Sequence, residues 1–494
     1  MSYILKNNKI FLNTARYLIS ILLSIIFLAG LYVYTGNKLI YLSFGLLNIY
    51  LIYFAFRKNA SFFETFFSVL LFFGFGFKFS IIISFTDGMF REGVGNFDYS
   101  ASSFDFALTT SSLALLSFIV AGHLREFFFN YPSQLSETSL NKNFYKNNRL
   151  KIIFFFLILI FSIFTVNVFF AVYQKGLVPI NDYNFFFSGF IKWSLLYGLT
   201  AIATLIIFLE INSFKKFFSL TVLLAIFETF ISSISMLSRG MIFNAAAIIF
   251  GIYKFCKKKK IIFDKKYFFL YIIFTILLFY ISVISVNHIR SNFFYIGKSV
   301  AKDFTDIENY KKTPKKEKDK RIIKKKKFNI IDSNNEFFYL AVNRWVGIDA
   351  VLAVTQNRDK LNFSLIKESL KEKFIKNEPT FYEKTFNLEQ QLTIDIYENV
   401  KGNTLTGIIA FLFYSGSFLF LISGMMILTF FANFIEYISF KFSEKNIVFS
   451  CLVGQIIAFR YIHFGYLPKQ SYLLFGSIFL TIFFVYLFTK LLKK

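Results

Sequence analysis

FSLTVLLAIFETFISSISMLSRGMIFNAAAIIFGIYKFC, residues Phe218–Cys256, consists of two apolar runs separated by a short polar break. Before Lys254, Glu228 and Arg239 are its only charged residues, and Arg239 lies in the break. A helix of about 20 apolar residues crosses the hydrocarbon core of a bilayer. The stretch therefore predicts two membrane spans joined by a turn that holds Arg239 at the surface.

The composition of the whole chain supports this interpretation. Of 494 residues, 56% are hydrophobic and 21% are aromatic. A soluble protein cannot cover so much apolar surface, so lipid is the expected surrounding for most of the side chains. The sequence predicts an all-α polytopic membrane protein with about twelve transmembrane helices. The predicted spans are Tyr17–Thr35, Leu39–Phe56, Phe62–Phe85, Phe106–Gly122, Ile152–Tyr173, Trp193–Leu209, Phe218–Leu237, Met241–Phe255, Tyr267–Val286, Ser415–Ile435, Ile447–Ile462 and Tyr472–Leu492.

The basic residues of the short connections predict the orientation. Most of them, including KFCKKKK at Lys254–Lys260, fall on one side, which the positive-inside rule assigns to the cytoplasm. Both termini are then cytoplasmic. The net charge of +26 is largely explained by this distribution, so no nucleic-acid partner is predicted.

One long connection divides the chain into three parts. Nine spans (1–287) precede a large outer loop, His288–Asn403, and three spans (404–494) follow it. In the loop, the lysine-rich run Lys311–Lys327 is typical of a solvated segment, and contact with anionic lipid head groups is the alternative. Glu336–Val354 and Ser364–Phe374 have the apolar spacing of amphipathic helices. The apolar run that starts at Leu405 is too long for one span, so its first part is expected to lie along the membrane or to re-enter it.

No motif for nucleotide hydrolysis, zinc proteolysis, serine hydrolysis or thiol redox chemistry is present in the sequence. The candidate functional residues are cationic and other ionisable residues that the predicted topology places at the outer side. They are Arg239, His288, Arg290, Arg344, Asp349, Arg460 and His463. Each taken singly also fits an interfacial or ion-pairing role. Together, the arginines suit a diphosphate, because guanidinium groups bind phosphate oxygens in pairs without a metal.

Two ionisable residues, Glu228 and Lys78, fall deep inside predicted spans. A charge in the bilayer is costly and usually faces the protein interior or a cavity. These residues are therefore candidates for an intramembrane function, and an interhelical structural role is the alternative.

The architecture resembles the O-antigen polymerases, the Wzy-type polymerases of bacterial polysaccharide repeat units. The similar features are about twelve spans with both termini inside, the Ser238-Arg239-Gly240 turn, the large outer loop before the last three spans, and GNTLTGIIAFLFYSGSFLFLISG at Gly402–Gly424. The spacing of arginine and glycine differs from that family, because Gly297 follows Arg290 and Gly347 follows Arg344.

The resemblance implies a metal-independent glycosyltransferase of the GT-C superfamily in the bacterial inner membrane, with no cofactor. It implies undecaprenyl-diphosphate-linked glycans as donor and acceptor, and a chain-length regulator and a flippase as partners. By position, Arg239, Arg290 and Arg344 match the family's outer-face arginines. We expect these three and Arg460 to bind the diphosphate, with Arg239 also stabilising charge in the transition state, and His288 or Asp349 to act as the base.

Two alternative functions remain open from the sequence. A ligase that transfers the finished glycan to another acceptor has the same topology and the same use of arginine. A flippase or other transporter has polar residues inside its spans, as Glu228 and Lys78 are here, although its outer loops are normally short.

Overall fold

The computed structural model describes residues 21–86, 88, 90, 93–132, 142–175, 183–217, 219–238, 240, 242–261, 264–301, 339–373, 379–388, 405–464 and 468–493. Within these ranges the regular structure is entirely helical. The lysine-rich run Lys311–Lys327 lies outside the described residues.

The first helix spans Ile21–Val33. The remaining helices are α2 (Lys38–Ala55), α3 (Phe62–Phe72), the π-helix η1 (Phe73–Phe77), α4 (Lys78–Phe85), α5 (Ala101–Arg125), α6 (Lys142–Phe170), α7 (Phe185–Trp193), the π-helix η2 (Ser194–Gly198), α8 (Leu199–Phe214), α9 (Leu220–Ser235), α10 (Ile242–Lys259), α11 (Lys265–Ala301), the π-helix η3 (Tyr339–Asn343), α14 (Ile348–Gln356), η4 (Arg358–Lys360), α15 (Phe363–Ser369), α16 (Phe381–Thr385), α17 (Gly407–Leu412), η5 (Phe413–Ser415), α18 (Phe418–Phe442), α19 (Ile447–Ile462) and α20 (Pro468–Leu491).

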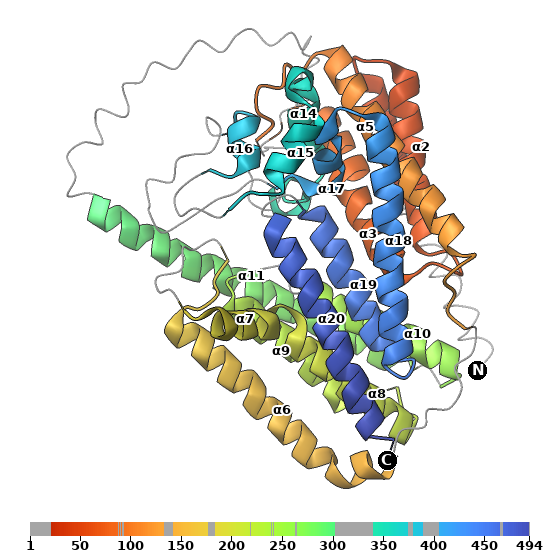
Figure 1. Cartoon of the computed structure of the whole chain (residues 1–494), viewed down its shortest axis with the longest axis vertical. Coiled ribbons are helices and arrows are strands. Elements are labelled where there is room, and N and C mark those ends of the chain that lie inside the picture. Colours follow the sequence, from red (N-terminus) through yellow and green to blue (C-terminus); the bar gives the residue numbers. More distant parts are fainter. Residues whose placement is uncertain are drawn as a thin grey trace.

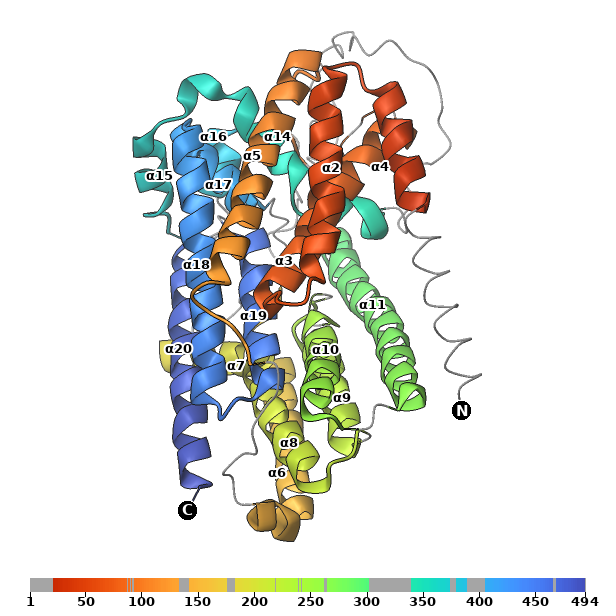
Figure 2. The same ribbon diagram turned by 90° about the vertical axis from the view of Figure 1, so that its right-hand side faces the viewer.

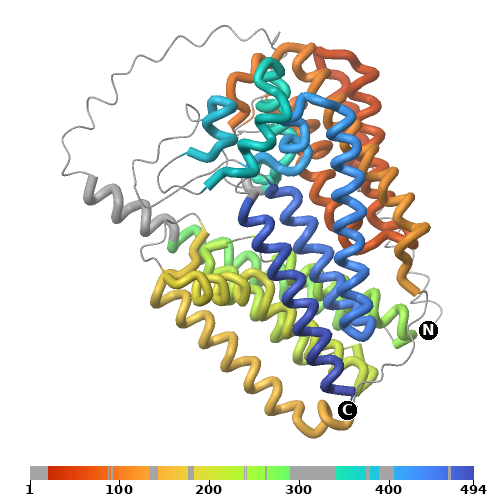
Figure 3. Tube along the Cα trace, viewed as in Figure 1, coloured from red at the N-terminus to blue at the C-terminus, as the bar shows by residue number. Residues whose placement is uncertain are grey.

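The helices form two adjoining groups that α19 and α20 connect. Figures 1 and 2 show α2, α3 and α5 beside the short helices α14–α17 at one end of the molecule, and α6, α8 and α9 at the other end. The trace in Figure 3 shows the N-terminal and C-terminal helices, red and blue, packed together into one body. Helix α19 packs against α10, α3 and α18, and every residue from Ile447 to Ala458 is buried. It is the central helix of the fold.

The membrane-protein prediction is confirmed at the level of architecture. In the described part of the chain, eight helices are long and apolar enough to cross a membrane. The shorter apolar helices Ile21–Val33, Leu220–Ser235 and Ile447–Ile462 coincide with three further predicted spans, and α10 coincides with the remaining one. The count of twelve spans stays a prediction. Helix α9 ends at Ser235 and α10 begins at Ile242, which agrees with the turn predicted between these two spans.

Helix α11 extends beyond the span predicted for it. The apolar pattern ends at Val286, but the helix continues to Ala301. His288 and Arg290 therefore lie within a helix, and not at the start of an irregular loop.

Polar side chains define where the central helices begin. The hydroxyl of Ser61 accepts a hydrogen bond from the backbone N–H of Glu64, while the Glu64 carboxylate accepts one from the N–H of Ser61. This reciprocal pair satisfies the first free N–H groups of α3. Asn446 caps α19 in the same way, since its side-chain oxygen accepts from the N–H groups of Val448 and Phe449.

A buried charge network joins the ends of α2, α3 and α5. Glu64 accepts from Arg57 at 2.9 Å and from Arg125 at 2.5 Å, and Arg57 also pairs with Glu126 at 2.8 Å. Glu64 and Arg125 are almost completely buried. Because each buried charge has opposite charges and hydrogen-bond partners around it, the network holds the three helices in one arrangement.

Glu336–Val354 does not form the single amphipathic helix predicted for it. Its described residues form η3, a break at Arg344–Gly347, and α14. The amine of Lys78 donates hydrogen bonds to the backbone carbonyl oxygens of Asn343 and Trp345. In a continuous helix, these oxygens would accept from backbone N–H groups instead. Helix α14 is also more buried than a surface helix, because every residue from Ile348 to Thr355 is buried. A further helix predicted for Ser364–Phe374 is shorter, and ends at Ser369.

Two glycines allow this break to pack directly on η1. A Cβ atom on Gly74 would lie 2.2 Å from the carbonyl oxygen of Val346, and one on Gly347 would lie 2.3 Å from the carbonyl oxygen of Gly74. No side chain fits between the two backbones. Phe73 and Trp345 stack beside them with ring centroids 4.7 Å apart.

The apolar run from Leu405 is divided, as its length predicts. Helix α17 is short and fully buried, and α18 begins only after Gly416, whose φ of 69° requires the left-handed conformation that glycine adopts readily.

Replacing Gly74 with alanine tests the contact between the two backbones. Alanine has a better helix propensity than glycine, so propensity alone predicts a gain in stability. We expect a loss of about 2 kcal/mol, since the added methyl overlaps Val346. Thermal unfolding in detergent measures the difference. Gly189→Ala is the matched control, because nothing lies within 4 Å of its Cβ position, and it should leave stability equal or higher. Equal stabilities for both variants would contradict the close packing.

Candidate functional site

Lys78, predicted to lie deep in a span, is fully buried and holds residues 343–349 of the predicted outer loop onto the helix bundle. We call residues 343–349 the outer-loop segment. Its amine donates to the carbonyl oxygens of Asn343 at 2.7 Å and Trp345 at 2.9 Å, and forms an ion pair with Asp349. The two carbonyls flank Arg344 in sequence. Lys78 therefore fixes the backbone that carries Arg344.

Three cations gather around His463 at the end of α19. Burial and, to a smaller extent, the positive charges of Lys175, Arg460 and Arg344 together lower the pKa of His463 to about 3. The imidazole is consequently neutral at pH 7. We call Lys175, Arg344 and Arg460 the cation cluster. The side chain of Arg344 is exposed, and that of Arg460 is half-buried, with its Nε donating to the Ser471 hydroxyl at 2.7 Å.

Aromatic rings lie between these charges. The rings of Phe459 and His463 have centroids 4.1 Å apart, and the Lys175 amine lies 5.9 Å from the Phe459 ring. On the other side, Phe459 contacts Phe243, which in turn reaches Trp345. The cation cluster is thus held by a continuous set of packed rings that runs from α19 to the outer-loop segment.

The segment that carries Lys175 is locked to the end of α9. The amide nitrogen of Asn167 donates to the backbone oxygens of Tyr173 and Ser235, and its oxygen accepts from the N–H of Tyr173. The N–H of Lys175 donates to the carbonyl of Met236 at 2.8 Å. Two connections, one after α6 and one after α9, therefore meet at the cation cluster.

The turn between α9 and α10 lies at the same place. The Ser233 hydroxyl donates to the carbonyl of Ser238 at 2.6 Å, and a Cβ atom on Gly240 would lie 3.2 Å from the Phe459 ring. Arg239, predicted to bind diphosphate, lies outside the described residues, but both of its neighbours belong to this turn.

The other predicted site residues lie in different surroundings. Arg290 lies on α11, and its side chain is outside the described part of the structure. His288 is exposed on α11, a helix that packs against α9 and α10. Asp349, the other candidate base, is buried and uses Oδ2 in the ion pair with Lys78. Of the candidate residues from the sequence, the structure brings Arg344, Arg460 and His463 together.

Glu228 is buried in α9 and is held by neutral groups. Thr200 donates to its Oε2 at 2.9 Å and Ser232 to its Oε1 at 2.7 Å. Asn244 of α10 donates to the Leu196 carbonyl of η2 at 2.9 Å and to the Thr200 hydroxyl of α8 at 3.4 Å. Glu228 connects the helices that support the α9–α10 turn, which agrees with the interhelical alternative.

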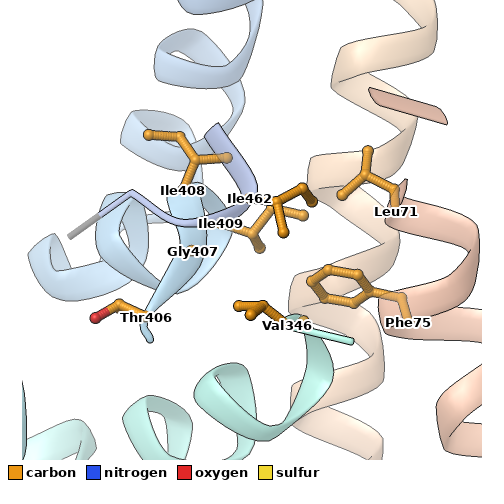
Figure 4. Close-up of a pocket in the computed structure, with 9 residues that line it drawn as sticks. Leu71, Phe75, Val346, Thr406, Gly407, Ile408, Ile409 and Ile462 are labelled. Atoms are coloured by element: carbon orange, nitrogen blue, oxygen red, sulfur yellow. The ribbon is translucent and has the colours of Figure 1, made fainter. Parts of the chain in front are cut away.

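Figure 4 shows an apolar pocket whose lining includes residues close in sequence to the cation cluster. Val346 and Gly347 of its wall follow Arg344 in sequence, and Ile462 lies between Arg460 and His463. The full lining is Leu71, Phe75, Val346, Gly347, Thr406, Gly407, Ile408, Ile409 and Ile462. Two of the three cations are thus at most two residues from a residue of the apolar lining in sequence.

The sequence analysis missed the central role of two residues. Lys175 is not among the candidate residues of the sequence analysis, and His463 is one of its two histidines. The role of Asn167, which positions Lys175, could not be predicted, because a single asparagine in an apolar run does not indicate which residue it bonds. The only available indication for Lys175 and His463 was that each lies at the outer end of a predicted span.

Among the described residues, no group of three His, Cys, Asp or Glu side chains is arranged to hold a metal ion. Comparisons with protein-family models, with curated proteins and with solved structures found no match.

Replacing Lys78 with methionine tests how firmly the outer-loop segment is held. The change removes the lysine that forms an ion pair with the buried Asp349 carboxylate, and breaking a buried ion pair typically costs about 3–5 kcal/mol. The double variant Lys78→Met/Asp349→Leu removes both charges and should recover most of the loss. Equilibrium unfolding in mixed micelles measures all three.

Lys493→Met is the control for removing a lysine from an ion pair. Lys493 bonds Glu444 at 2.6 Å but is 41% exposed, so its loss should cost at most about 1 kcal/mol. If Lys78→Met were no more destabilised than this control, the buried ion pair would not anchor the segment.

Proposed function

We propose that this chain is a membrane glycosyltransferase that polymerises undecaprenyl-diphosphate-linked repeat units at the periplasmic face of a bacterial inner membrane. The observation that carries the proposal is the convergence of Lys175, Arg344 and Arg460 around the end of α19. These residues come from three distant parts of the chain, and separate backbone anchors hold two of them there.

The charge of the cation cluster suits a diphosphate. Arginine forms paired, charge-assisted hydrogen bonds with phosphate oxygens, and lysine adds a compact positive charge. When the bond between the sugar and the diphosphate breaks, negative charge grows on the leaving oxygen. Cations fixed at that position stabilise the transition state more than the ground state, which is the requirement for catalysis.

The apolar pocket supports an amphiphilic substrate. A lipid-linked glycan has a hydrocarbon tail on one side of its diphosphate and sugars on the other. Val346 and Ile462 of its lining lie two residues after Arg344 and Arg460 in sequence. In the proposed complex, the apolar part of the carrier next to the diphosphate contacts this lining.

The test is lengthening of lipid-linked repeat units by the purified protein in detergent or nanodiscs. We expect a ladder of products, and a decrease of about 10- to 100-fold in kcat/KM for Arg344→Gln and Arg460→Gln. The matched control is Arg358→Gln. Arg358 is exposed and lies over the Phe106 ring at 3.5 Å, outside the cation cluster, so the variant should retain wild-type activity.

Two other outcomes would assign a different function. Transfer of a preassembled long glycan to a new acceptor, without lengthening of repeats, would indicate a ligase. Movement of the lipid-linked unit across a vesicle membrane without any glycan transfer would indicate a flippase. In cells, deletion should leave single repeats on the acceptor, whereas loss of a ligase leaves long chains on the carrier lipid.

A further inference from the structure

The hydrogen bond of His463 determines which ring nitrogen is basic. Nδ1 lies 2.8 Å from the backbone carbonyl oxygen of Phe459. A carbonyl oxygen only accepts hydrogen bonds, so Nδ1 carries the proton and donates it. In a neutral imidazole the other nitrogen, Nε2, then holds a free lone pair. Among the described residues, no hydrogen-bond partner of Nε2 is observed.

We propose that His463 is the catalytic base of the transfer reaction, with Nε2 as the proton acceptor. The inference rests on the proposed function. The acceptor hydroxyl gives its proton to Nε2 while its oxygen forms a bond to the anomeric carbon of the donor. The bond from that carbon to the diphosphate breaks, and its electron pair leaves with the diphosphate. The imidazolium then returns the proton to the departing diphosphate or to water.

The cation cluster gives this base a dependence on the donor. With the site empty, Lys175, Arg344 and Arg460 disfavour a further positive charge on the ring. A bound diphosphate balances these charges, so the imidazolium that forms during transfer is stabilised only when the donor is present. The base is thus placed beside the leaving group that neutralises its surroundings.

Rigid elements hold His463 in position. It directly follows α19, and its ring packs on Phe459 of that helix. The carbonyl of the next residue, Phe464, accepts from the N–H of Gly407 at 2.8 Å, and the Phe464 ring packs on Phe411 of α17. A base needs such support, because proton transfer requires a fixed distance to the reacting hydroxyl.

His463 also fits better than the two bases that the sequence suggests. Asp349 is engaged by Lys78, and proton transfer to it would compete with a buried ion pair that holds the outer-loop segment. His288 lies on α11, whereas the cations that suit the diphosphate surround His463.

The experiment compares His463→Asn with the wild-type protein in the repeat-lengthening assay. Asparagine keeps a side-chain N–H for the Phe459 carbonyl but cannot take a proton. We expect kcat to decrease by about 100-fold or more. Binding of undecaprenyl diphosphate, measured by its protection against thermal unfolding, should stay within about threefold. His463→Gln, which also lacks a base, serves if the asparagine variant does not fold.

The control is His123→Asn, since His123 is exposed at the end of α5 and bonds the Tyr50 hydroxyl; its kcat should be unchanged. Three results would overturn the assignment of His463 and leave the proposed function standing. The first is a wild-type kcat in His463→Asn, and the second is a loss of diphosphate binding as large as the loss of kcat. The third is a large decrease of kcat in His288→Asn and not in His463→Asn. Absence of lengthening by the wild-type protein would overturn the proposed function itself, and this inference with it.

Discussion

The structure depends on one buried charge, the amine of Lys78. An ammonium group inside a membrane protein is unfavourable unless opposite charge and oxygen acceptors surround it. The outer-loop segment supplies all of these, as the carboxylate of Asp349 and the carbonyls of Asn343 and Trp345. The need to satisfy Lys78 therefore draws a polar segment into the helix bundle, and Gly74 and Gly347 let the two backbones meet there.

From this constraint follows the composition of the candidate site. Arg344 lies between the two carbonyls that Lys78 holds, so its position is fixed by the bundle. Arg460 and His463 belong to the end of the central helix α19, and Lys175 is tied to the end of α9. Cations from three segments thus surround one neutral imidazole beside an apolar pocket. Such an arrangement suits a substrate that joins a hydrocarbon tail, a diphosphate and a sugar, and it requires no metal in the proposed reaction.

Sequence patterns located the helices well and the contacts between them poorly. Apolar runs of membrane length identify spans because lipid imposes that length, and the turn at Arg239 follows from the polar break alone. The hydrophobic spacing across Glu336–Val354 predicted one helix. Periodicity contains no information about a hydrogen bond from Lys78, which lies 265 residues away from Asn343 in sequence and donates to its carbonyl oxygen. The ion pair with the same lysine explains why Asp349, a candidate base from the sequence, has a structural role instead. His463 could not be ranked above His288 until its hydrogen bond and its cationic neighbours were known.

The most direct test of this account is a cryo-electron-microscopy structure of the protein with undecaprenyl diphosphate bound. The account predicts phosphate oxygens within about 3 Å of the Arg344 and Arg460 guanidinium groups, the Lys175 amine at the same anion, and an intact ion pair between Lys78 and Asp349. A diphosphate bound away from the end of α19, or one that requires the Lys78–Asp349 pair to open, would contradict it.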